Sequence, residues 1–327
     1  MNEFALIDLI QSTCALHRPD VRIGIGDDAA AIDVPEGHEL LICTDTLVAG
    51  RHFPINTRAE DIGWKSLAVN LSDLAAMGGT PAFALLALCL PDSDETWVRA
   101  FARGFSELAS MHNVALIGGD TTRGPLAVTV TALGFAPRGR ALRRSGAQVG
   151  DTIVVTGALG AAAAGLHFLE LRPECGRAYR LDPNRFDHQC VTALDRPAPQ
   201  IAQGIALRDY ASSAIDISDG LAADLGHVLR LSETGADIEL GLLPGWQALS
   251  EVLSLEQATR LVLSGGDDYV VLATVPPNRL QEAELAVKST GAVLTTIGHV
   301  SAEPGLRIRD PQGNLIHVDK AGWDHFA

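Results

Sequence analysis

The chain is poor in aromatic residues, in lysines and in paired cysteines, and each shortage limits what the protein can be. Aromatics make up 5% of the 327 residues, so the core must be largely aliphatic. The five cysteines are odd in number and include no CxxC pair. A disulfide framework or a structural zinc site is therefore disfavoured. We expect buried free thiols in a reducing compartment.

Long apolar stretches and a basic leader are also missing. The longest strongly apolar run, residues 82–90, is too short to span a bilayer. Acidic Glu3 and Asp8 interrupt the first apolar stretch, which is untypical of a signal peptide. The formal charge of −15 disfavours binding to nucleic acid or to anionic membrane. The sequence predicts a cytoplasmic protein that binds neither.

Helical and strand patterns alternate along the chain in two halves. A segment rich in Pro, Gly and Arg, residues 136–150, predicts a boundary between domains 1–138 and 149–327. The pattern predicts an α/β or α+β fold in each half. Ser254 and Gln257 have the spacing of a capping box, and Gly235 is expected to close a helix over 221–233. Further helices are expected at 2–17, 59–77, 93–112, 160–171 and 198–210, and strands at 39–44, 82–90, 114–117, 126–135, 151–156, 214–217 and 269–275.

The informative residues are aspartates beside glycine or in turns. Singly, each is most simply a turn or cap residue. Asp73 is different, because it lies in a helical stretch between Leu71 and Leu74, where an ionised carboxylate needs a partner. Ser66 and Asn70 share its helical face. The segments concerned are Gly26-Asp27-Asp28, Thr44-Asp45-Thr46, Asn70 to Asp73, Gly118-Gly119-Asp120-Thr121, Asp216 to Gly220 and Gly265 to Asp268.

If these acids converge, they need cations. Two carboxylates about 5 Å apart repel by roughly 3 kcal/mol at an effective dielectric near 20. Oxygen ligands select hard ions, and few ligands from many segments suit Mg²⁺, which keeps waters and shares phosphate oxygens. The pattern therefore indicates an enzyme that handles a nucleoside triphosphate through magnesium ions.

Other phosphate and hydrolase motifs fit poorly. None of the three lysines follows a P-loop pattern, and neither HExxH nor GxSxG occurs. The nearest dinucleotide-binding match, Gly24-x-Gly26-x-x-Ala29, would direct two aspartates at a pyrophosphate. The basic segment 139–146 is either a solvated linker or the source of an arginine on triphosphate oxygens.

Together these motifs resemble the thiamine-monophosphate kinase family, within the superfamily of aminoimidazole ribonucleotide synthetase and selenophosphate synthetase. The resemblance runs nearly end to end and in order. It rests on GIGDDAA (24–30), TDTLVAGRHF (44–53), NLSDLAAMG (70–78), LIGGDTTRGP (116–125), GRALRRSGA (139–147), VTGALG (155–160), AIDISDGL (214–221), SGGDDY (264–269) and GWDHF (322–326).

The resemblance implies an N-terminal mixed sheet that forms a barrel across a homodimer, and a C-terminal α/β domain that closes over the nucleotide. It implies ATP as co-substrate and thiamine monophosphate as acceptor, bound by His52, Asp267 and Trp323. Contacts to ATP would come from Gly119, Asp120, Arg144 and Ser218, with Asp120, Arg144 and Asp219 catalytic. Several Mg²⁺ ions would be held at Asp28, Cys43, Thr44, Asp45, Asp73, Asp120, Asp216 and Asp219.

Two positions depart from the family pattern. Asp267 stands where the family more often has Glu, which shortens the reach by one methylene. Cys43 stands where Ser is frequent, and the exchange is harmless if the metal contact is the backbone carbonyl.

The chemistry implied is direct in-line phosphoryl transfer. The attacking phosphate oxygen is already ionised near neutral pH, so no general base is required. An acid at Asp267 and an aromatic at Trp323 suit the cationic thiazolium ring of the substrate. Two alternatives stay open: a sister ATP-dependent synthetase acting on a purine precursor, and a non-catalytic magnesium or nucleotide sensor.

Overall fold

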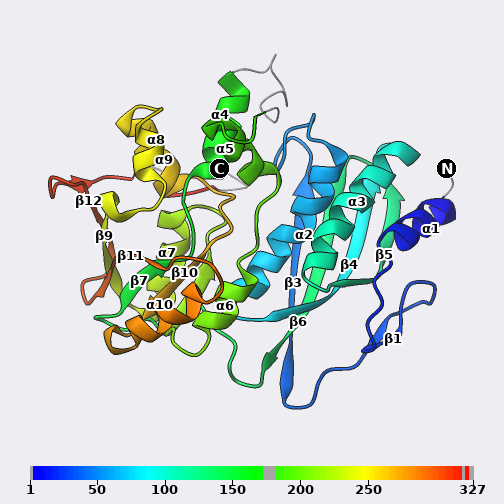
Figure 1. Cartoon of the computed structure of the whole chain (residues 1–327), viewed down its shortest axis with the longest axis horizontal. Coiled ribbons are helices and arrows are strands. Elements are labelled where there is room, and N and C mark those ends of the chain that lie inside the picture. Colours follow the sequence, from blue (N-terminus) through cyan, green and yellow to red (C-terminus); the bar gives the residue numbers. More distant parts are fainter. Residues whose placement is uncertain (1–2, 172–181, 319–320, 324–327) are drawn as a thin grey trace. The chain divides into compact units, whose positions relative to one another are not determined.

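The chain forms two compact units in a computed structural model that describes residues 3–171, 182–318 and 321–323. One unit comprises residues 1–74 and 79–139, and the other comprises residues 75–78 and 140–327. Figure 1 shows their helices and strands, which are numbered in chain order. The second unit thus includes the last residues of a helix that begins in the first.

The first unit is built on a four-stranded sheet of order β3-β6-β4-β5, in which only the β4–β5 pair is parallel. Helices α2 and α3 lie side by side along this sheet (Figure 1). Its elements are α1 (Glu3–Thr13), β1 (Val21–Ile23), β2 (Ala31–Ile32), β3 (His38–Val48), α2 (Ala59–Ala76), β4 (Thr80–Leu90), α3 (Glu95–Met111), β5 (Ala115–Arg123) and β6 (Ala127–Pro137).

Side chains of β6 alternate between the two faces of this sheet as their sequence predicts. Val128 and Val130 are fully buried, whereas Thr129 and Thr131 are partly exposed. The helices approach each other closely at glycine: a Cβ on Gly104 of α3 would lie 1.7 Å from the carbonyl oxygen of Glu60. This close crossing fixes α2, which carries several candidate site residues.

The opposite face of the sheet is only partly covered. At one end Phe83 and Phe135 pack edge to face, with ring centroids 5.8 Å apart, in a small buried cluster. Further along the sheet, Ile42 is 62% exposed and Thr46 and Ala87 are also exposed. This exposed part, which we call the open sheet face, presents apolar and hydroxyl side chains in adjacent strands.

The second unit is built on a mixed seven-stranded sheet of order β13-β12-β9-β11-β7-β10-β8, in which the β12–β9 pair is parallel. Its elements are β7 (Thr152–Val155), α4 (Ala161–Leu171), α5 (Phe186–Asp195), α6 (Ile201–Leu207), β8 (Ser213–Asp216), α7 (Leu221–Ser232), β9 (Gly235–Glu239), η2 (Leu240–Leu242), α8 (Trp246–Ser250), α9 (Leu255–Ser264), β10 (Val271–Val275), η3 (Pro277–Arg279), α10 (Leu280–Lys288), β11 (Thr295–Ser301), β12 (Gly305–Arg309) and β13 (Leu315–Ile316).

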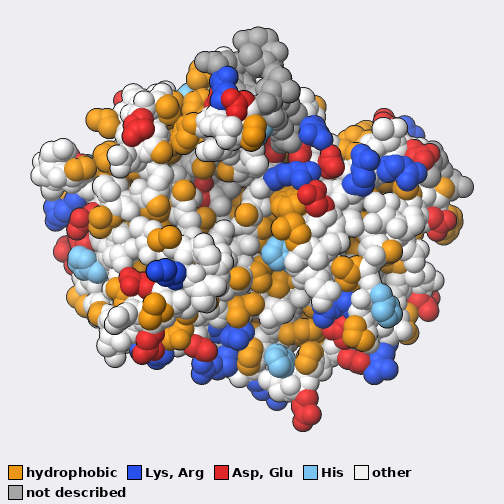
Figure 2. Space-filling view, in the orientation of Figure 1, with side chains coloured by type: hydrophobic (Ala, Val, Ile, Leu, Met, Phe, Trp, Pro, Cys, Tyr) orange, Lys and Arg blue, Asp and Glu red, His pale blue; other side chains and the backbone are white. Residues whose placement is uncertain are grey.

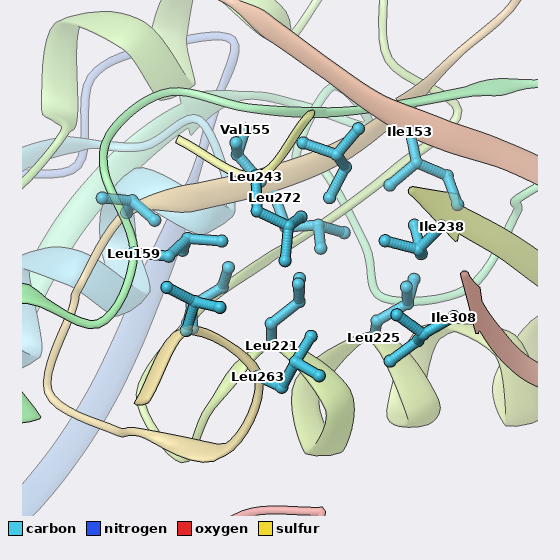
Figure 3. Close-up of a cluster of buried hydrophobic side chains, with 14 of the residues drawn as sticks. Ile153, Val155, Leu159, Leu221, Leu225, Ile238, Leu243, Leu263, Leu272 and Ile308 are labelled. Carbon is cyan, nitrogen blue, oxygen red and sulfur yellow. The ribbon is translucent and has the colours of Figure 1, made fainter. Parts of the chain in front are cut away.

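An aliphatic core holds α7 against this sheet. Figure 3 shows Leu221 and Leu225 of α7 pointing toward Val155 and Leu272 of the strands, and all four are at most 1% exposed. Burying one such leucine contributes about 2 kcal/mol. The core therefore fixes the start of α7, where the loop rich in aspartate ends.

Helix ends show where local sequence signals hold and where they fail. The capping box of α9 is confirmed, because the Ser254 hydroxyl accepts from the Gln257 amide and the Gln257 side chain reaches back. The expectation that Gly235 closes α7 is wrong. Glu233 adopts the left-handed conformation there, with φ 55°, and Gly235 begins β9. A Cβ on Gly235 would lie 1.7 Å from the Glu303 carbonyl oxygen, so its role is close strand packing.

Acidic and basic side chains lie interspersed on the face that Figure 2 shows. Surface ion pairs include Arg58–Glu60 and Arg279–Glu282. No helix in the described ranges has the length and apolarity needed to cross a membrane.

Candidate substrate and metal site

Two predicted acids of the first unit lie beside one thiol. Cys43 and Asp45 are two residues apart on β3, so their side chains share one face of the sheet. The Cys43 Sγ donates to the Asn70 carbonyl oxygen of α2 at 3.2 Å, which places α2 over that face. Burial, followed by the negative charges of Asp73 and Asp45, raises the pKa of the Cys43 thiol. Asp45 and Asp73 therefore converge on Cys43 from different elements.

This group has the donor chemistry of a hard-cation site. The Asn70 Oδ1 is buried and has no hydrogen-bond donor among the described residues, while its Nδ2 donates to the Ser66 carbonyl oxygen at 3.1 Å. A buried oxygen without a partner is costly, and a cation or its water would satisfy it. Hard cations prefer oxygen to sulfur, so a metal contact at Cys43 would use its carbonyl oxygen.

Thr44 and Asp120 lie on the open sheet face. The Thr44 hydroxyl donates to the Val130 carbonyl oxygen at 3.1 Å and accepts from the Thr131 hydroxyl. Asp120 is exposed and aligned with Ala87 of β4, one of the exposed residues of that face. Register therefore places Asp120 on the face opposite to Cys43 and Asp45. The structure connects Asp45 with Asp73 more directly than with Asp120.

Gly119 precedes Asp120 at a point where β5 lies very close to β4. Its φ is +153°, and a Cβ there would lie 1.8 Å from the Leu86 carbonyl oxygen. Any larger residue would push the two strands apart. Glycine at this position therefore sets where Asp120 stands on the sheet.

Asp28 lies in an exposed turn between β1 and β2, where its amide donates to the Asp27 carboxylate at 3.1 Å.

Among the described residues, no three His, Cys, Asp or Glu side chains already form a group that could hold a metal ion. A cation here would thus need water, carbonyl or substrate oxygens in addition to carboxylates, as Mg²⁺ commonly does.

His52 has a defined ring orientation in the loop after β3. The backbone amide of Val48 donates to its Nδ1 at 2.9 Å, and the His52 amide donates to the Val48 carbonyl oxygen at 3.0 Å. Because Nδ1 accepts, the proton of the neutral ring must be on Nε2. His52 therefore carries its ring proton on Nε2, which is the tautomer that a phosphate-binding histidine requires.

In the second unit, the loop from β8 to α7 carries three predicted ligands. Asp216 ends β8 and is 4% exposed, and Asp219 lies one residue before the helix N-cap Gly220. The amides of Ser218, Asp219 and Gly220 all donate to Asp224 Oδ2, at 3.0 to 3.1 Å. Burial and the nearby charges of Asp216 and Asp219 raise the pKa of Asp224 to about 7. Asp224 thus fixes the loop that presents the ligands.

A second segment, between α9 and β10, is pinned to this loop by main-chain contacts. The Asp267 amide donates to the Ser218 carbonyl oxygen and the Tyr269 amide to that of Ile217, each at 2.8 Å. Asp267 and Tyr269 both have positive φ, 68° and 50°, which is uncommon for residues other than glycine. The Tyr269 hydroxyl donates to Asp267 Oδ1 at 2.8 Å and fixes that carboxylate.

A third segment, near the end of the chain, reaches the same loop. The Trp323 amide donates to the Asp219 carbonyl oxygen at 3.1 Å, and the Trp323 side chain is 47% exposed. A Cβ on Gly322 would lie 2.6 Å from that same oxygen, so the approach requires glycine. Asp219, Asp267 and Trp323 are therefore brought together by backbone contacts.

Arg144 lies near this group of residues, as the contacts of Arg143 and His227 indicate. The Arg143 carbonyl oxygen accepts from the Ala214 amide at 2.8 Å, which ties the basic segment to the start of β8. The pKa of His227 on α7 is lowered by burial and by the charges of Arg230 and Arg144, and Asp219 opposes this shift. Arg144 and Asp219 thus lie near the same imidazole.

Several residues with a positional role were not predicted. Asp224 binds the amides of the 218–220 loop, and Asp268 accepts from the Gly160 amide at the start of α4, at 2.8 Å. Lys65 of α2 donates to the His52 carbonyl oxygen. The sequence contains one signal for Asp224. It is an acid placed one helical turn after the Ser218-Asp219-Gly220 turn, and such an acid can accept from the exposed backbone amides at the start of a helix.

Comparison with known proteins agrees with the two halves of the fold. Residues 26–136 match the family model described as AIR synthase related protein, N-terminal domain, and residues 148–311 match the corresponding C-terminal domain. Both halves are thus those of AIR synthase-related proteins, and the predicted two-domain α/β fold is confirmed.

Relatives that match over the full length narrow this class. The thiamine-monophosphate kinase of Escherichia coli K12 is 48% identical, with 99% of this chain and 98% of that protein covered. The Bacillus subtilis enzyme of the same name is 34% identical, with both chains fully covered. The chain belongs to the thiamine-monophosphate kinase family.

Solved structures agree. Thiamine-monophosphate kinase from Stenotrophomonas maltophilia superimposes with a TM-score of 0.87 at 44% identity, covering 97% of this chain and 98% of that one. The structure described as AaThiL complexed with AMPPCP and TMP gives a TM-score of 0.77 at 30% identity, covering 99% and 97%.

Proposed function

We propose that the protein transfers the γ-phosphoryl group of ATP to thiamine monophosphate, giving thiamine diphosphate and ADP. Family membership over the full length supports this reaction. So does the similarity to a relative whose structure was solved with an ATP analogue and TMP. This reaction would be the last step of thiamine diphosphate synthesis.

The observation that carries the proposal is the meeting of three segments at residues 217–219. The α9–β10 segment brings Asp267 to Ser218, and the C-terminal segment brings Trp323 to Asp219. An acid and an aromatic then stand beside a loop of further acids. This combination suits a substrate that has both a cationic ring and a phosphate.

Magnesium fits the oxygen-rich groups of both units. In the first unit Asp45, Asp73 and the main chain at Cys43 would hold one ion, and Thr44 and Asp120, on the opposite face of the sheet, would belong to a separate ion, with Asp28 as a further ligand. In the second unit the ligands of magnesium would be Asp216 and Asp219. When bound, it would neutralise phosphate charge and polarise the transferring phosphoryl group. The buried Asn70 Oδ1 without a partner supports a cation near Asp73.

The side chains of this protein then position and neutralise rather than move protons. A phosphate monoester has its second pKa near 6, so the attacking oxygen is ionised at neutral pH. That oxygen forms a bond to the γ-phosphorus as the bond to the ADP oxygen breaks. His52 Nε2–H donates to the acceptor phosphate, while Arg144, Ser218, Gly119 and Asp120 hold the nucleotide. Asp267 and Trp323 bind the thiazolium ring.

We also propose that the open sheet face is where two copies pair in a homodimer. A side chain such as Ile42, 62% exposed, is costly to leave in water beside other apolar groups. The rows of threonine hydroxyls, joined by the 2.8 Å contact of Thr46 with Thr129, would provide polar contacts across that interface.

One assay tests the function. Purified protein is incubated with ATP, Mg²⁺ and thiamine monophosphate, and products are read by mass. We expect thiamine diphosphate and ADP in equal amounts, and no turnover after chelation of Mg²⁺. A panel of other phosphorylated acceptors distinguishes this kinase from a sister synthetase, which would turn over a different acceptor. A sensor would bind ATP but release no ADP with any acceptor. Either result would overturn the proposal.

A further inference from the structure

Lys65 is a buried cation that the proposed mechanism does not use. It lies in the second turn of α2 and is 2% exposed. A buried ammonium is costly unless it has acceptors and an opposite charge. One acceptor of its ammonium group is the His52 carbonyl oxygen, at 3.2 Å. Asp61, four residues earlier on the same helix face, is fully buried and has the opposite charge.

The His52 carbonyl oxygen, which accepts from Lys65, belongs to a loop that has further hydrogen bonds of its own. The His52 Nδ1 accepts from the Val48 amide at 2.9 Å, which orients the ring. Within the same turn, the Gly50 amide donates to the Phe53 carbonyl oxygen at 2.9 Å. These contacts are internal to the loop. The bond from Lys65 is different, because it ties the His52 main chain to α2.

Helix α2 is a firm reference for that loop. It carries Asp73, and close packing with α3 at Gly104 fixes its position. A charged donor makes a stronger hydrogen bond to a carbonyl than a neutral donor does. Lys65 therefore links the His52 main chain to the helix that carries Asp73, a proposed metal ligand.

We propose that Lys65 is a positioning residue, whose ammonium holds the His52 carbonyl oxygen so that Nε2–H faces the phosphate of thiamine monophosphate. The inference rests on the proposed function, since His52 acts on that substrate. Lys65 does not touch the substrate itself, because its side chain is enclosed.

The test is a double-mutant cycle between Lys65 and His52. K65M leaves Asp61 buried without the lysine one turn away, so D61N/K65M, which removes both charges together, is the working variant. We expect KM for thiamine monophosphate to rise about tenfold with KM for ATP within about twofold, because small misplacement of a binding group costs this much or more. In an H52A background the same two substitutions should change nothing further.

Two measurements separate positioning from plain stability. The Kd of thiamine monophosphate without ATP should weaken by the same factor, and the melting temperature of D61N/K65M should stay near that of wild type. K288M, the same exchange at an exposed lysine of α10, is the matched control and should leave both constants unchanged.

Additive effects of D61N/K65M and H52A would overturn the inference, as would equal rises in both KM values. If D61N/K65M does not fold, the same cycle is run with K65R, which keeps the charge and changes the donor geometry. Failure of the proposed function itself is recognised separately, because wild-type protein would then form no thiamine diphosphate.

Discussion

The backbone amide of Asp267 donates to the carbonyl oxygen of Ser218 at 2.8 Å. This bond joins the main chains of two loops that lie far apart in the sequence. The backbone of Asp267 is left-handed, with φ 68°, a conformation that Asp and Asn adopt more readily than other residues with side chains. The residue type at 267 is thus chosen for backbone shape as well as for charge.

D267N separates these two roles. Asparagine keeps the backbone preference and removes the charge, so the fold should be unaffected while the attraction to the thiazolium ring is lost. We expect KM for thiamine monophosphate to rise about tenfold, equivalent to about 1.4 kcal/mol. Steady-state kinetics and a melting curve check this. Y210F, at a tyrosine of the same unit that stacks under Arg279, is a control that should change neither.

D73N tests the proposed metal group of the first unit. Asp73 and Asp45 both act on Cys43, and an amide at 73 removes one negative ligand while retaining shape. Turnover should fall at least about a hundredfold, as expected when charge stabilisation of phosphoryl transfer is lost. D8N, at an exposed acid of α1, should retain wild-type activity. Full activity of a well-folded D73N protein would remove Asp73 from the metal assignment.

G322A tests whether the C-terminal segment must touch the loop. The new Cβ would lie 2.6 Å from the Asp219 carbonyl oxygen and 2.7 Å from Ala223 Cβ, so the segment has to move away. We expect KM for thiamine monophosphate to rise several-fold while the melting temperature changes little. G226A on α7, where a Cβ meets nothing within 4 Å, should leave KM unchanged and stabilise the protein by about 0.5–1 kcal/mol.

The pair of Asp237 and Arg307 predicts a pH dependence of stability. Arg307 donates to both carboxylate oxygens, at 2.9 and 3.0 Å, and holds the pKa of Asp237 below its ordinary value. Unfolding restores the ordinary pKa near 3.9, so the unfolded chain binds more protons at low pH. The pair thus stabilises the fold fully above about pH 5 and ceases to do so as pH falls through the folded pKa.

D237N should therefore lower the free energy of unfolding by about 1 kcal/mol at pH 7, a value discounted for partial exposure. At a pH below the folded pKa of Asp237, wild type and variant should unfold alike. Denaturant titrations across this range measure the difference. E282Q, which breaks the more exposed pair with Arg279, should have less effect than D237N at pH 7.

Periodicity predicted those parts of the fold that local sequence dictates. Val128 and Thr129 lie on opposite faces because alternation in a half-buried strand has a simple physical cause. Glu233 shows the limit: a charged residue took the left-handed cap position, and Gly235 was needed where β9 passes close to the 303 backbone. That requirement comes from a distant segment, so no local pattern contains it.

The candidate site likewise has residues that the sequence predicts and contacts that it does not. Motifs predicted Asp219, Asp267 and Trp323 as site residues. The bonds that bring these residues together run between backbone groups, which are the same in every sequence. Lys65 was passed over because an isolated lysine in an apolar helix has no motif. Its meaning comes only from the carbonyl oxygen that it meets.

The bond between Trp323 and Asp219 has a consequence for how the protein is made. A ribosome finishes the loop around Asp219 long before it adds Trp323, so the nascent chain can fold much of its second sheet while that loop still lacks its last contact. Truncation before Gly322 would thus leave the aliphatic core around that sheet complete and remove the contact to Asp219.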